Sequence, residues 1–429
     1  MLDERRNLGL SEAESGGVES NVRLILDNVR KNGLQAVIDY TRNFDSENFR
    51  EEQLAISPEA CAEAARSLDQ QDLEIIYEAA ANIRCFHEAQ KEKSWFITRE
   101  DGSVLGQTII PLNRAGIYVP GGRGGNTPLI SSLLMGAIPA QVAGVREIAI
   151  VTPPRNDGSV NPYILAAANL LGIKEVYACG GAWGIGALAF GAGPIRPVEI
   201  IAGPGNIWVA TAKRLLIGQV GIDMIAGPSE VLILADAGAN PQLIAADMLA
   251  QAEHDSLASA ICLTTSAALA AKVKEELERQ LPTLPRAEMA GKSLRNWGAV
   301  VQAPNMTEAV EMINTMAPEH LEIICRNPWA ALGGVKNAGA VFLGAYSAEA
   351  LGDYYAGPNH ILPTMGTARF ASALGVQSFC KRTSVIAASA AFAESGAAAV
   401  ARLARLEGLE GHARAAEARC KTVAQTQTI

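Results

Sequence analysis

The stretch Ile222–His254 (IDMIAGPSEVLILADAGANPQLIAADMLAQAEH) passes from a strand pattern to a helix pattern. Its centre, EVLILAD, is a short apolar run that follows Gly and Pro, which predicts a buried strand. The segment after it repeats small and apolar residues at helical spacing, with two unlike faces. One face holds Met248, Leu249 and Ala252, and the other holds Asp247, Gln251 and His254. This polar face is either the solvated side of an amphipathic helix or a set of side chains directed at a ligand.

The same alternation of strand and helix extends outward on both sides of this stretch. Before it, candidate strands lie at AGIYVPGG, EIAIVTPP, EVYACGG and EIIAGPG, with helical segments between them. After it, candidate strands lie at SAICLTTS, GAVVQAPN, HLEIICRN and GAVFLG. Strands that alternate with helices predict parallel sheets covered by helices on both faces. We therefore expect an α/β protein with two Rossmann-like parallel-sheet units, divided near residues 225–230.

Both ends of the chain have helical patterns, at residues up to about 90 and again after about 370. We expect an N-terminal segment at residues 1–15 and a C-terminal helical tail at 371–429. Between them we expect a first, discontinuous α/β domain at 16–118 plus 230–370, which includes the N-terminal helices. A second α/β domain is expected at 119–229. Turns rich in Gly and Pro follow several expected strands, and because open α/β sheets bind ligands at the carboxyl ends of their strands, we expect the site there.

Charge and composition exclude several classes of protein. The chain of 429 residues has 36 Lys and Arg against 45 Asp and Glu, a net charge of −9, so the basic surface of a nucleic-acid binder is not expected. The first residues lack the apolar core of a signal peptide, and no apolar run is long enough for a membrane span. The seven cysteines form no CxxC pair, which favours reduced thiols over disulfides or thiolate zinc sites. We therefore expect a cytoplasmic protein that binds neither nucleic acid nor membrane.

Four of the five histidines follow residue 250, in segments rich in Gln, Glu, Asp, Gly and Pro. Gln251 and His254 are three residues apart on one helix, so an amide oxygen and an imidazole nitrogen could bind one metal ion. Asp353 in LGDYYAGPNH and His412 in EGLEGH are the candidates for two further ligands. Such a set of two nitrogen and two oxygen ligands suits Zn²⁺, with Mn²⁺ or Co²⁺ as alternatives. By spacing alone, a solvated helix face explains Gln251 and His254 as well.

Glu319 and His320 are adjacent where the expected strand HLEIIC begins. Adjacent titratable groups at a strand edge can act as an acid–base pair, because imidazole titrates near neutral pH. The alternative is a turn with one exposed carboxylate. The residues themselves favour this simpler interpretation.

The segment from Ile222 to His254 resembles the signature of the histidinol dehydrogenase family throughout its length. Similarity continues in AGIYVPGG, IAGPGN, PEHLEI, GDYYAGPNHILPTMGTARF, KRTSVI and EGLEGHAR. It covers residues from about 20 to about 415. The resemblance implies a zinc- and NAD-dependent oxidoreductase of histidine biosynthesis. Such an enzyme oxidises L-histidinol through histidinal to L-histidine in two hydride transfers, with one Zn²⁺ per subunit.

The resemblance also implies roles for individual residues. The zinc ligands would be Gln251, His254, Asp353 and His412, with His412 supplied by the partner subunit, so that an intertwined homodimer with a shared active site is expected. Glu319 and His320 would be the catalytic pair, with His320 as the base for the alcohol and Glu319 activating water. Substrate would contact the four zinc ligands together with Ser229, His320, His360 and Glu407. The cofactor contacts would include Tyr118 and Asn206.

The chain departs from the family pattern on the cofactor side. Trp183 stands where the family usually has a glutamine that contacts NAD. A tryptophan can stack on a ring but cannot accept a hydrogen bond, so cofactor contact by Trp183 is an open alternative. The loop GGRGGNTPLISS after Pro120 is also longer than usual.

Three other functions remain alternatives to histidinol oxidation. A related zinc- and NAD-dependent enzyme could oxidise another primary alcohol, such as sulfopropanediol. A zinc hydrolase could use Glu319 to activate water without any cofactor, but it would leave Tyr118 and Asn206 without a role. A non-catalytic binding protein would have no need of both Glu319 and His320.

Overall fold

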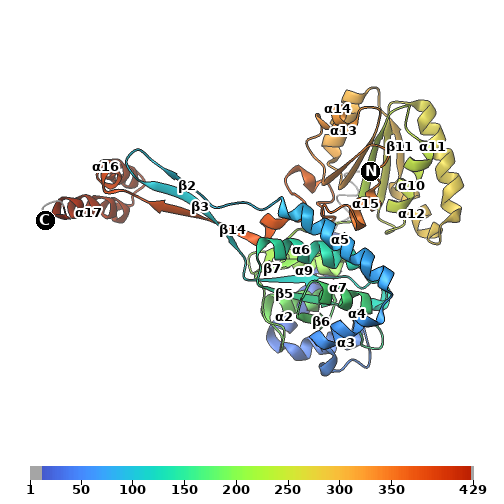
Figure 1. Cartoon of the computed structure of the whole chain (residues 1–429), viewed down its shortest axis with the longest axis horizontal. Coiled ribbons are helices and arrows are strands. Elements are labelled where there is room, and N and C mark those ends of the chain that lie inside the picture. The colour runs from blue at the N-terminus through green and yellow to red at the C-terminus, as the bar shows by residue number, and fades with distance from the viewer. Residues whose placement is uncertain (1–11, 427–429) are drawn as a thin grey trace. The chain divides into compact units, whose positions relative to one another are not determined.

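The computed structural model describes residues 12–426 of the chain (Figure 1). The described part divides into two compact units. The first unit contains the residues up to Gln90 and Leu112–Phe379, and the second contains Lys91–Pro111 and the residues from Cys380 onward. The first unit holds two separate parallel sheets, and the second holds a small antiparallel sheet followed by two helices.

A six-stranded sheet forms the core of the N-terminal half of the first unit. Its strand order is β1-β6-β5-β4-β7-β8, and every neighbouring pair is parallel except β1 with β6. The strands are β1 (Ala55–Ile56), β4 (Arg114–Tyr118), β5 (Glu147–Thr152), β6 (Glu175–Ala178), β7 (Ile200–Ala202) and β8 (Gly221–Ile222). The central strand β4 is buried along its whole length, which explains its apolar and small residues.

The helices that cover this sheet come from both sides of β4 in the sequence. They are α2 (Glu12–Asn32), α3 (Leu34–Phe44), α4 (Pro58–Ser67), α5 (Gln70–Glu88), α6 (Ile130–Ala143), α7 (Pro162–Leu170), α8 (Gly181–Phe190) and α9 (Ile207–Leu215). The N-terminal helices dock on the later ones, with α2 on α8 and α9, α3 on α8, α4 on α7, and α5 on α6. Val22, Leu26 and Val29 of α2 are thereby buried in the same core as β4.

A five-stranded parallel sheet forms the C-terminal half of the first unit. Its strand order is β11-β10-β9-β12-β13. The strands are β9 (Glu230–Ala235), β10 (Ser259–Thr264), β11 (Ala299–Gln302), β12 (His320–Ile324) and β13 (Ala340–Leu343). The helices are α10 (Pro241–Ala252), α11 (Ala267–Gln280), α12 (Ala287–Trp297), α13 (Met306–Met316), α14 (Pro328–Leu332) and α15 (Glu349–Tyr354).

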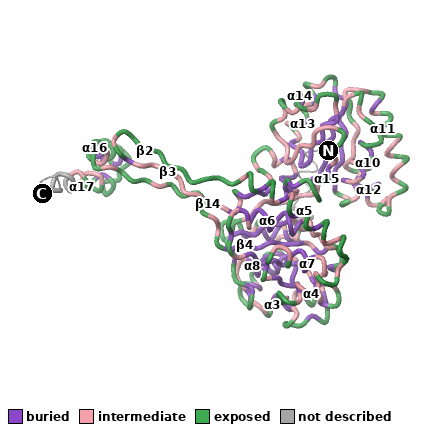
Figure 2. The backbone as a smooth tube through the Cα atoms, in the orientation of Figure 1, coloured by how far each residue is buried: buried purple, intermediate pink, exposed green. Residues whose placement is uncertain are grey.

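Strand β9 shows why this sheet is covered on both faces. Its residues point alternately to opposite faces, so Val231 and Ile233 enter one apolar cluster while Leu232 and Leu234 enter another. The first cluster is closed by residues of α10 and α11, and the second by residues of α13 and α14. Figure 2 shows burial concentrated along the strands of both sheets of the first unit.

The second unit is built from segments far apart in the sequence. Strands β2 (Trp95–Thr98), β3 (Val104–Pro111) and β14 (Cys380–Ala387) form an antiparallel sheet of order β14-β3-β2. Helices α16 (Ala390–Leu406) and α17 (Glu410–Thr426) follow and pack against each other. Short 3₁₀ turns elsewhere in the chain span Glu51–Gln53, Arg123–Gly125, Leu281–Thr283, Thr367–Arg369 and Val376–Phe379.

The expected α/β class with two parallel sheets is confirmed, and all nine strands expected from the sequence are present. The expected domain boundaries divide the chain differently from the structure. Residues 16–118 were expected with 230–370, but β4 pairs with β5 and β7, and the N-terminal helices pack on the six-stranded sheet. The reason is that β4 is apolar on both faces and therefore takes the centre of that sheet.

The expected helical tail at 371–429 also begins differently. Leu374, Val376 and Phe379 are buried in the core of the first unit, and β14 precedes the two C-terminal helices. The sequence of β14, CKRTSVIA, has no clean alternation, and the strand is exposed at every residue except Cys380 and Val385, which are half-buried. The expected N-terminal segment at 1–15 lies mostly outside the described residues.

None of the described helices is long and apolar enough to cross a membrane. All seven cysteines are free thiols.

Candidate active site and metal centre

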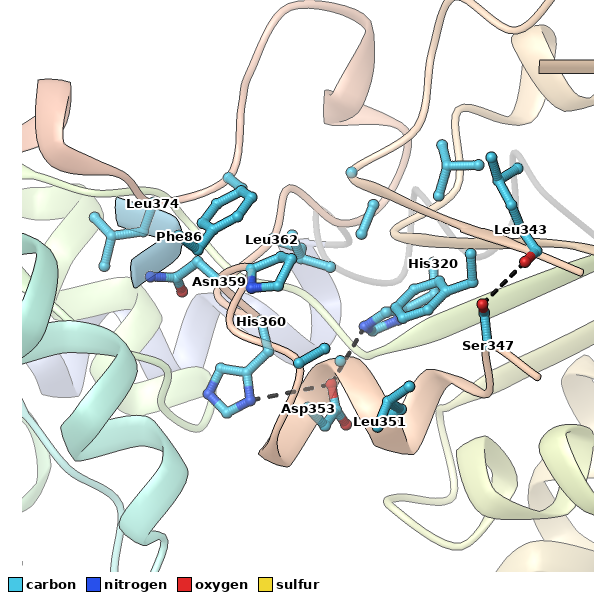
Figure 3. Close-up of a pocket in the computed structure, with 18 of the residues that line it drawn as sticks. Phe86, His320, Leu343, Ser347, Leu351, Asp353, Asn359, His360, Leu362 and Leu374 are labelled. Atoms are coloured by element: carbon cyan, nitrogen blue, oxygen red, sulfur yellow. Dashed lines mark hydrogen bonds and ion pairs between the residues drawn. The ribbon is translucent and has the colours of Figure 1, made fainter. Parts of the chain in front are cut away.

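A pocket of about 440 Å³ opens in the first unit beside the amino ends of β12 and β13 (Figure 3). Titratable and amide side chains from different elements meet at its wall, namely those of His320, Asp353, Asn359 and His360. The remaining wall includes Phe86 and Gln90 of the N-terminal half. The expectation of a site at the carboxyl ends of strands is wrong for this sheet, because the reactive residues stand where its strands begin.

Glu319 and His320 are both buried, so the alternative of an exposed turn carboxylate is wrong. The Oε2 atom of Glu319 accepts a hydrogen bond from the backbone N–H of Glu230 at 2.8 Å, at the start of β9. The Nδ1 atom of His320 lies 3.2 Å from the Glu230 carbonyl oxygen. The pair is therefore fixed by the parallel neighbour of its own strand.

The backbone next to Glu319 is closely packed and strained. Gly339 donates its N–H to the Pro318 carbonyl at 2.9 Å, and a Cβ at Gly339 would lie 2.6 Å from the Glu319 carbonyl oxygen. Ala317, two residues before Glu319, has a φ of 49°, a left-handed conformation that costs a non-glycine residue about 1 kcal/mol. Strain of this kind is typical of functional sites, and here it lies just before Glu319 and the pocket-lining His320.

Helix α15 brings two carboxylates to the imidazole of His320. Glu349 and Asp353 are four residues apart and so lie on one face of the helix. The Nδ1 atom of His320 is 3.6 Å from Oε1 of Glu349, and its Nε2 atom is 3.7 Å from Oδ1 of Asp353. Figure 3 shows His320 and His360 on two sides of Asp353, and Nδ1 of His360 is 4.0 Å from the same Oδ1.

Helix α10 brings Gln251 and His254 to the same place. Gln251 is fully buried, and with its amide nitrogen facing Glu349 it donates to both carboxylate oxygens, at 2.5 and 3.1 Å. His254 lies at the end of the helix and is exposed. The polar face noted in the sequence is thus not a solvated surface at Gln251, because that side chain is enclosed beside α15.

The residues present fit a divalent cation. His254, Glu349 and Asp353 each offer one ligand atom, and these atoms lie within 4.8 Å of one another. The Nε2 atom of His320 is buried without a hydrogen-bond partner among the described residues and lies 3.7 Å from Oδ1 of Asp353, so a buried nitrogen atom borders the same cluster. One imidazole and two carboxylates, next to a buried amide, form a donor set that suits zinc.

Burial and close charges shift the pKa values of Glu319 and His320. Burial raises the pKa of Glu319 above its ordinary range. Burial would lower the pKa of His320, but the carboxylates of Glu349, Glu319 and Asp353 outweigh it and raise the pKa of the imidazole. Burial would likewise raise the pKa of Asp353, but contact with His320 outweighs it and lowers that pKa. This group of carboxylates therefore stabilises a positive charge among them, either a protonated imidazole or a bound cation.

Ser229 and His360 are the other substrate contacts expected in the first unit. Ser229 lies beside Glu230, whose backbone contacts Glu319 and His320, and His360 lies beside Asp353. Ser229 directly precedes β9, and its carbonyl accepts the N–H of Ser259 at 3.0 Å. Glu230, the next residue, accepts the N–H of Met365 through Oε1 at 3.0 Å. His360 lines the pocket itself, and burial lowers its pKa, so that its ring is neutral at physiological pH.

Glu407 and His412 belong to the second unit and are not members of the cluster formed within the first. Glu407 follows α16, and His412 lies in the first turn of α17. Both side chains are exposed. Their expected roles as substrate contact and zinc ligand stay predictions.

The residues expected to contact the cofactor lie at the carboxyl edge of the six-stranded sheet. Tyr118 ends β4 and accepts the N–H of Gly181 at 3.3 Å through its hydroxyl. Asn206 follows β7 and caps α9, accepting the N–H groups of Trp208 and Val209. A Cβ on Gly203 would lie 2.1 Å from the Tyr118 carbonyl, so only glycine allows these two strand ends to approach so closely.

Trp183 is buried in the packing of α8 rather than displayed at the sheet edge. Its Nε1 atom donates to Oγ1 of Thr41 at 3.0 Å, and its ring stacks on Phe44 at a centroid distance of 5.4 Å. These contacts assign the side chain a structural role between α3 and α8. Arg123–Gly125 in the long loop after Pro120 forms a short turn packed against Pro154.

Two buried carboxyl groups at the site were missed from the sequence, Glu349 and Glu322, and Glu322 accepts the N–H of Glu349 at 2.8 Å. Asp247, noted on the polar face of α10, is half-buried beside Glu322. The spacing of Glu349 and Asp353 was a usable signal, because both fall on one face of a short helix. The sequence contained no such signal for Glu322, because a glutamate within an apolar strand is normally interpreted as facing solvent.

Comparison with known proteins gives a consistent result. The chain matches the family model for histidinol dehydrogenase over residues 10–420. It is 60% identical over 408 residues to the histidinol dehydrogenase of Oleidesulfovibrio alaskensis, covering 95% of this chain and 94% of that protein. It is 51% identical over 421 residues to that of Bacillus subtilis, covering 97% of each. The crystal structure of histidinol dehydrogenase from Elizabethkingia anophelis superposes with a TM-score of 0.90 at 36% identity, covering 95% of this chain and 93% of that one.

Proposed function

The chain belongs to the histidinol dehydrogenase family, and from this premise we propose that it oxidises L-histidinol through histidinal to L-histidine with NAD as the hydride acceptor. L-histidinol, one water and two NAD would give L-histidine, two NADH and three protons. The observation that carries the proposal is the buried pair Glu319–His320 beside a candidate cation-binding cluster, with His320 and Asp353 lining one pocket.

His320 is positioned to act as the base of the first oxidation. The imidazole is enclosed between the carboxylates of Glu349 and Asp353, which hold the ring in place and stabilise it when it is protonated. It would take the alcohol proton while hydride leaves the carbon for NAD. The Glu230 carbonyl, 3.2 Å from Nδ1, fixes the tautomer that leaves Nε2 free to accept.

Glu319 is positioned to act in the second oxidation. Its carboxylate would take a proton from the water that attacks histidinal, and the resulting hydrate would lose the second hydride to NAD. The N–H of Glu230 holds one oxygen of Glu319, so the other is left to face water. In this proposal His320 takes the proton of the alcohol in the first oxidation, and Glu319 takes the proton of water in the second.

We propose that zinc is held by Gln251, His254 and Asp353 of one subunit and by His412 of the partner subunit. Glu349 holds the Gln251 amide by its nitrogen, which leaves the amide oxygen for the metal. Bound zinc would orient the substrate and, through its charge, lower the pKa of the neighbouring catalytic groups.

The second unit supports a homodimer. Its strands and α16 expose large apolar side chains that a folded monomer would leave in water. They include Trp95 and Phe96, which are 52% and 53% exposed, and Leu403 and Leu406, which are 63% and 73% exposed. A partner subunit of the same sequence would cover them and bring His412 to the neighbouring site. The cytoplasmic location expected from the sequence stays a prediction.

The deciding test is the number of NADH molecules formed per L-histidinol, measured in zinc-loaded protein with histidinol limiting. Two NADH per histidinol is the expected result. One would indicate a related alcohol dehydrogenase that stops at the aldehyde. None, in folded and metal-loaded protein, would refute histidinol as the substrate.

A further inference from the structure

Asp45, the residue that follows α3, carries a carboxylate oxygen that is buried without a partner. Its Oδ2 atom has no hydrogen bond, and the side chain forms no ion pair with any described residue. Burial raises its pKa to about 7. The residue as a whole is half-buried. A buried carboxylate oxygen without a partner costs free energy on folding, so its presence needs an explanation other than stability.

The backbone at the end of α3 is held in place by contacts on both sides of Asp45. The backbone N–H groups of Asp45 and Ser46 both donate to the Thr41 carbonyl at 2.9 Å. Trp183 of α8 donates to the Thr41 hydroxyl and stacks on Phe44. The hydroxyl of Ser46 donates to the Asn156 carbonyl at 2.8 Å, in the loop after β5. Asp45 is thus fixed from both sides.

Asp45 lies near the carboxyl edge of the six-stranded sheet, because the next residue, Ser46, bonds to the loop after β5. Besides burial, the negative charge of Asp45 contributes to raising the pKa of both Tyr118 and Cys179. Tyr118 ends β4, Cys179 follows β6, and β5 lies between these strands in the sheet. The carboxyl edge of the central strands is where an open α/β sheet binds its ligand.

We propose that the Asp45 carboxylate accepts a hydrogen bond from a ribose hydroxyl of NAD. The inference rests on the proposed function, since it assigns a residue to the NAD site. A carboxylate can only accept, so it pairs with the hydroxyl donors of the cofactor and repels its phosphates. The same charge would disfavour a phosphate on that ribose and so select NAD over NADP. Asp45 comes from the N-terminal helices, which the family resemblance did not single out.

The test is isothermal calorimetry of NAD binding to full-length, zinc-loaded protein, with Asp45→Asn and Asp45→Ala compared with the wild type. A lost hydrogen bond to a charged group weakens binding roughly 10- to 100-fold. We expect that loss together with an unchanged or higher Tm, because the variants remove an unpaired buried charge. Asp39→Asn, an exposed position of the same helix, is the matched control and should bind NAD like the wild type.

Competition of NAD binding by AMP and by nicotinamide mononucleotide identifies the ribose, because only the fragment that contacts Asp45 should lose affinity in Asp45→Asn. Unchanged NAD affinity in both Asp45 variants would overturn the inference, and so would a fall in affinity matched by a fall in Tm. In that case, two NADH per histidinol in the wild type would leave the proposed function standing. A wild type that binds no NAD would refute both.

Discussion

Glu319 and His320 are neighbours in the sequence but have different surroundings, which is the basis for the different roles proposed for them. One oxygen of Glu319 is held by the backbone of β9, whereas the ring of His320 lies between two carboxylates of α15. Gln251 illustrates the same dependence on surroundings. Its amide would be an ordinary solvated group on a surface helix, but beside Glu349 it becomes an oriented donor.

The proposed role of Glu319 predicts a selective defect. Glu319→Gln keeps the shape and can still accept the Glu230 N–H, but it cannot take a proton from water. We expect the oxidation of histidinal to slow by roughly 10²- to 10⁴-fold, with a smaller effect on the oxidation of histidinol. Single-turnover NADH formation from each substrate measures the two steps separately. Equal losses in both would remove the water-activating role.

The proposed metal ligands predict that binding and turnover fail together. His254→Ala removes one ligand of the cluster while α10 stays packed, so zinc content and turnover should both fall severely. Metal analysis after dialysis, beside the rate of NADH formation, measures this. Gln242→Ala, at an exposed position of the same helix, should behave like the wild type. A fully active His254→Ala protein without bound metal would contradict the ligand assignment.

Replacing Trp183 should lower the stability of the fold, although the family resemblance implied a cofactor contact at this position. Trp183→Phe keeps an aromatic ring but leaves the Thr41 hydroxyl without its donor, which should lower the free energy of unfolding by about 1 kcal/mol. Urea denaturation measures it. A variant with wild-type stability and weakened NAD binding would instead show that the indole contacts the cofactor.

At the scale of elements, the amino edge of the six-stranded sheet is held by a cluster of charges. Arg114 begins β4, and its side chain is only 7% exposed. It forms two hydrogen bonds with Glu175 at the start of β6, at 2.7 and 2.5 Å, and one with Glu147 at the start of β5. Three neighbouring strands thus share one guanidinium, whose planar geometry matches the two carboxylates.

This cluster predicts a pH-dependent contribution to stability. The hydrogen bond to Arg114 is the largest cause that lowers the pKa of Glu175, to about 2. Because the folded pKa lies below the unfolded one, the stabilisation is present above about pH 4.5 and is lost as the pH falls toward 2. Glu175→Gln should therefore cost about 1–2 kcal/mol at pH 7, after allowance for solvent screening, and much less near pH 2. Denaturant unfolding at both pH values tests it, and a cost independent of pH would contradict it.

At the scale of the whole molecule, the first unit contains the catalytic pair and most of the proposed metal ligands, while the second contains His412. The second unit has little apolar core of its own, since Ala401, Ala404 and Ala413 form its buried cluster. Its exposed aromatic and leucine side chains are better explained by an interface than by a free surface.

A shared site predicts complementation between inactive variants. His254→Ala and His412→Ala should each be inactive alone. In a mixed dimer, the His412→Ala subunit keeps its own His254 and receives His412 of the partner subunit, so one of its two sites is intact. Co-refolding equal amounts should restore about a quarter of the wild-type activity per site. If His412 acted within its own chain, the mixture would stay inactive.

Short-range patterns in the sequence predicted nine strands of the two larger sheets, but not the two-residue strands β1 and β8. Apolar runs such as EVLILAD and HLEIIC are local signals, and their meaning does not depend on distant residues. Charge and composition likewise need no structure. The sequence motifs also pointed to Glu319, His320 and the polar face of α10, which the structure places beside one another.

What the sequence by itself determined is therefore most strands of the two larger sheets, the α/β class and, through an extended patterned match, the family. The tertiary structure alone decided that β4 centres the six-stranded sheet, that β14 pairs with β3, and that Glu349 meets Gln251 and His320. It also decided that Trp183 packs inside while Asp45 lies near the sheet edge. The physical reason is that periodicity reports which face of an element is apolar. Which element covers that face depends on contacts between residues far apart in the chain.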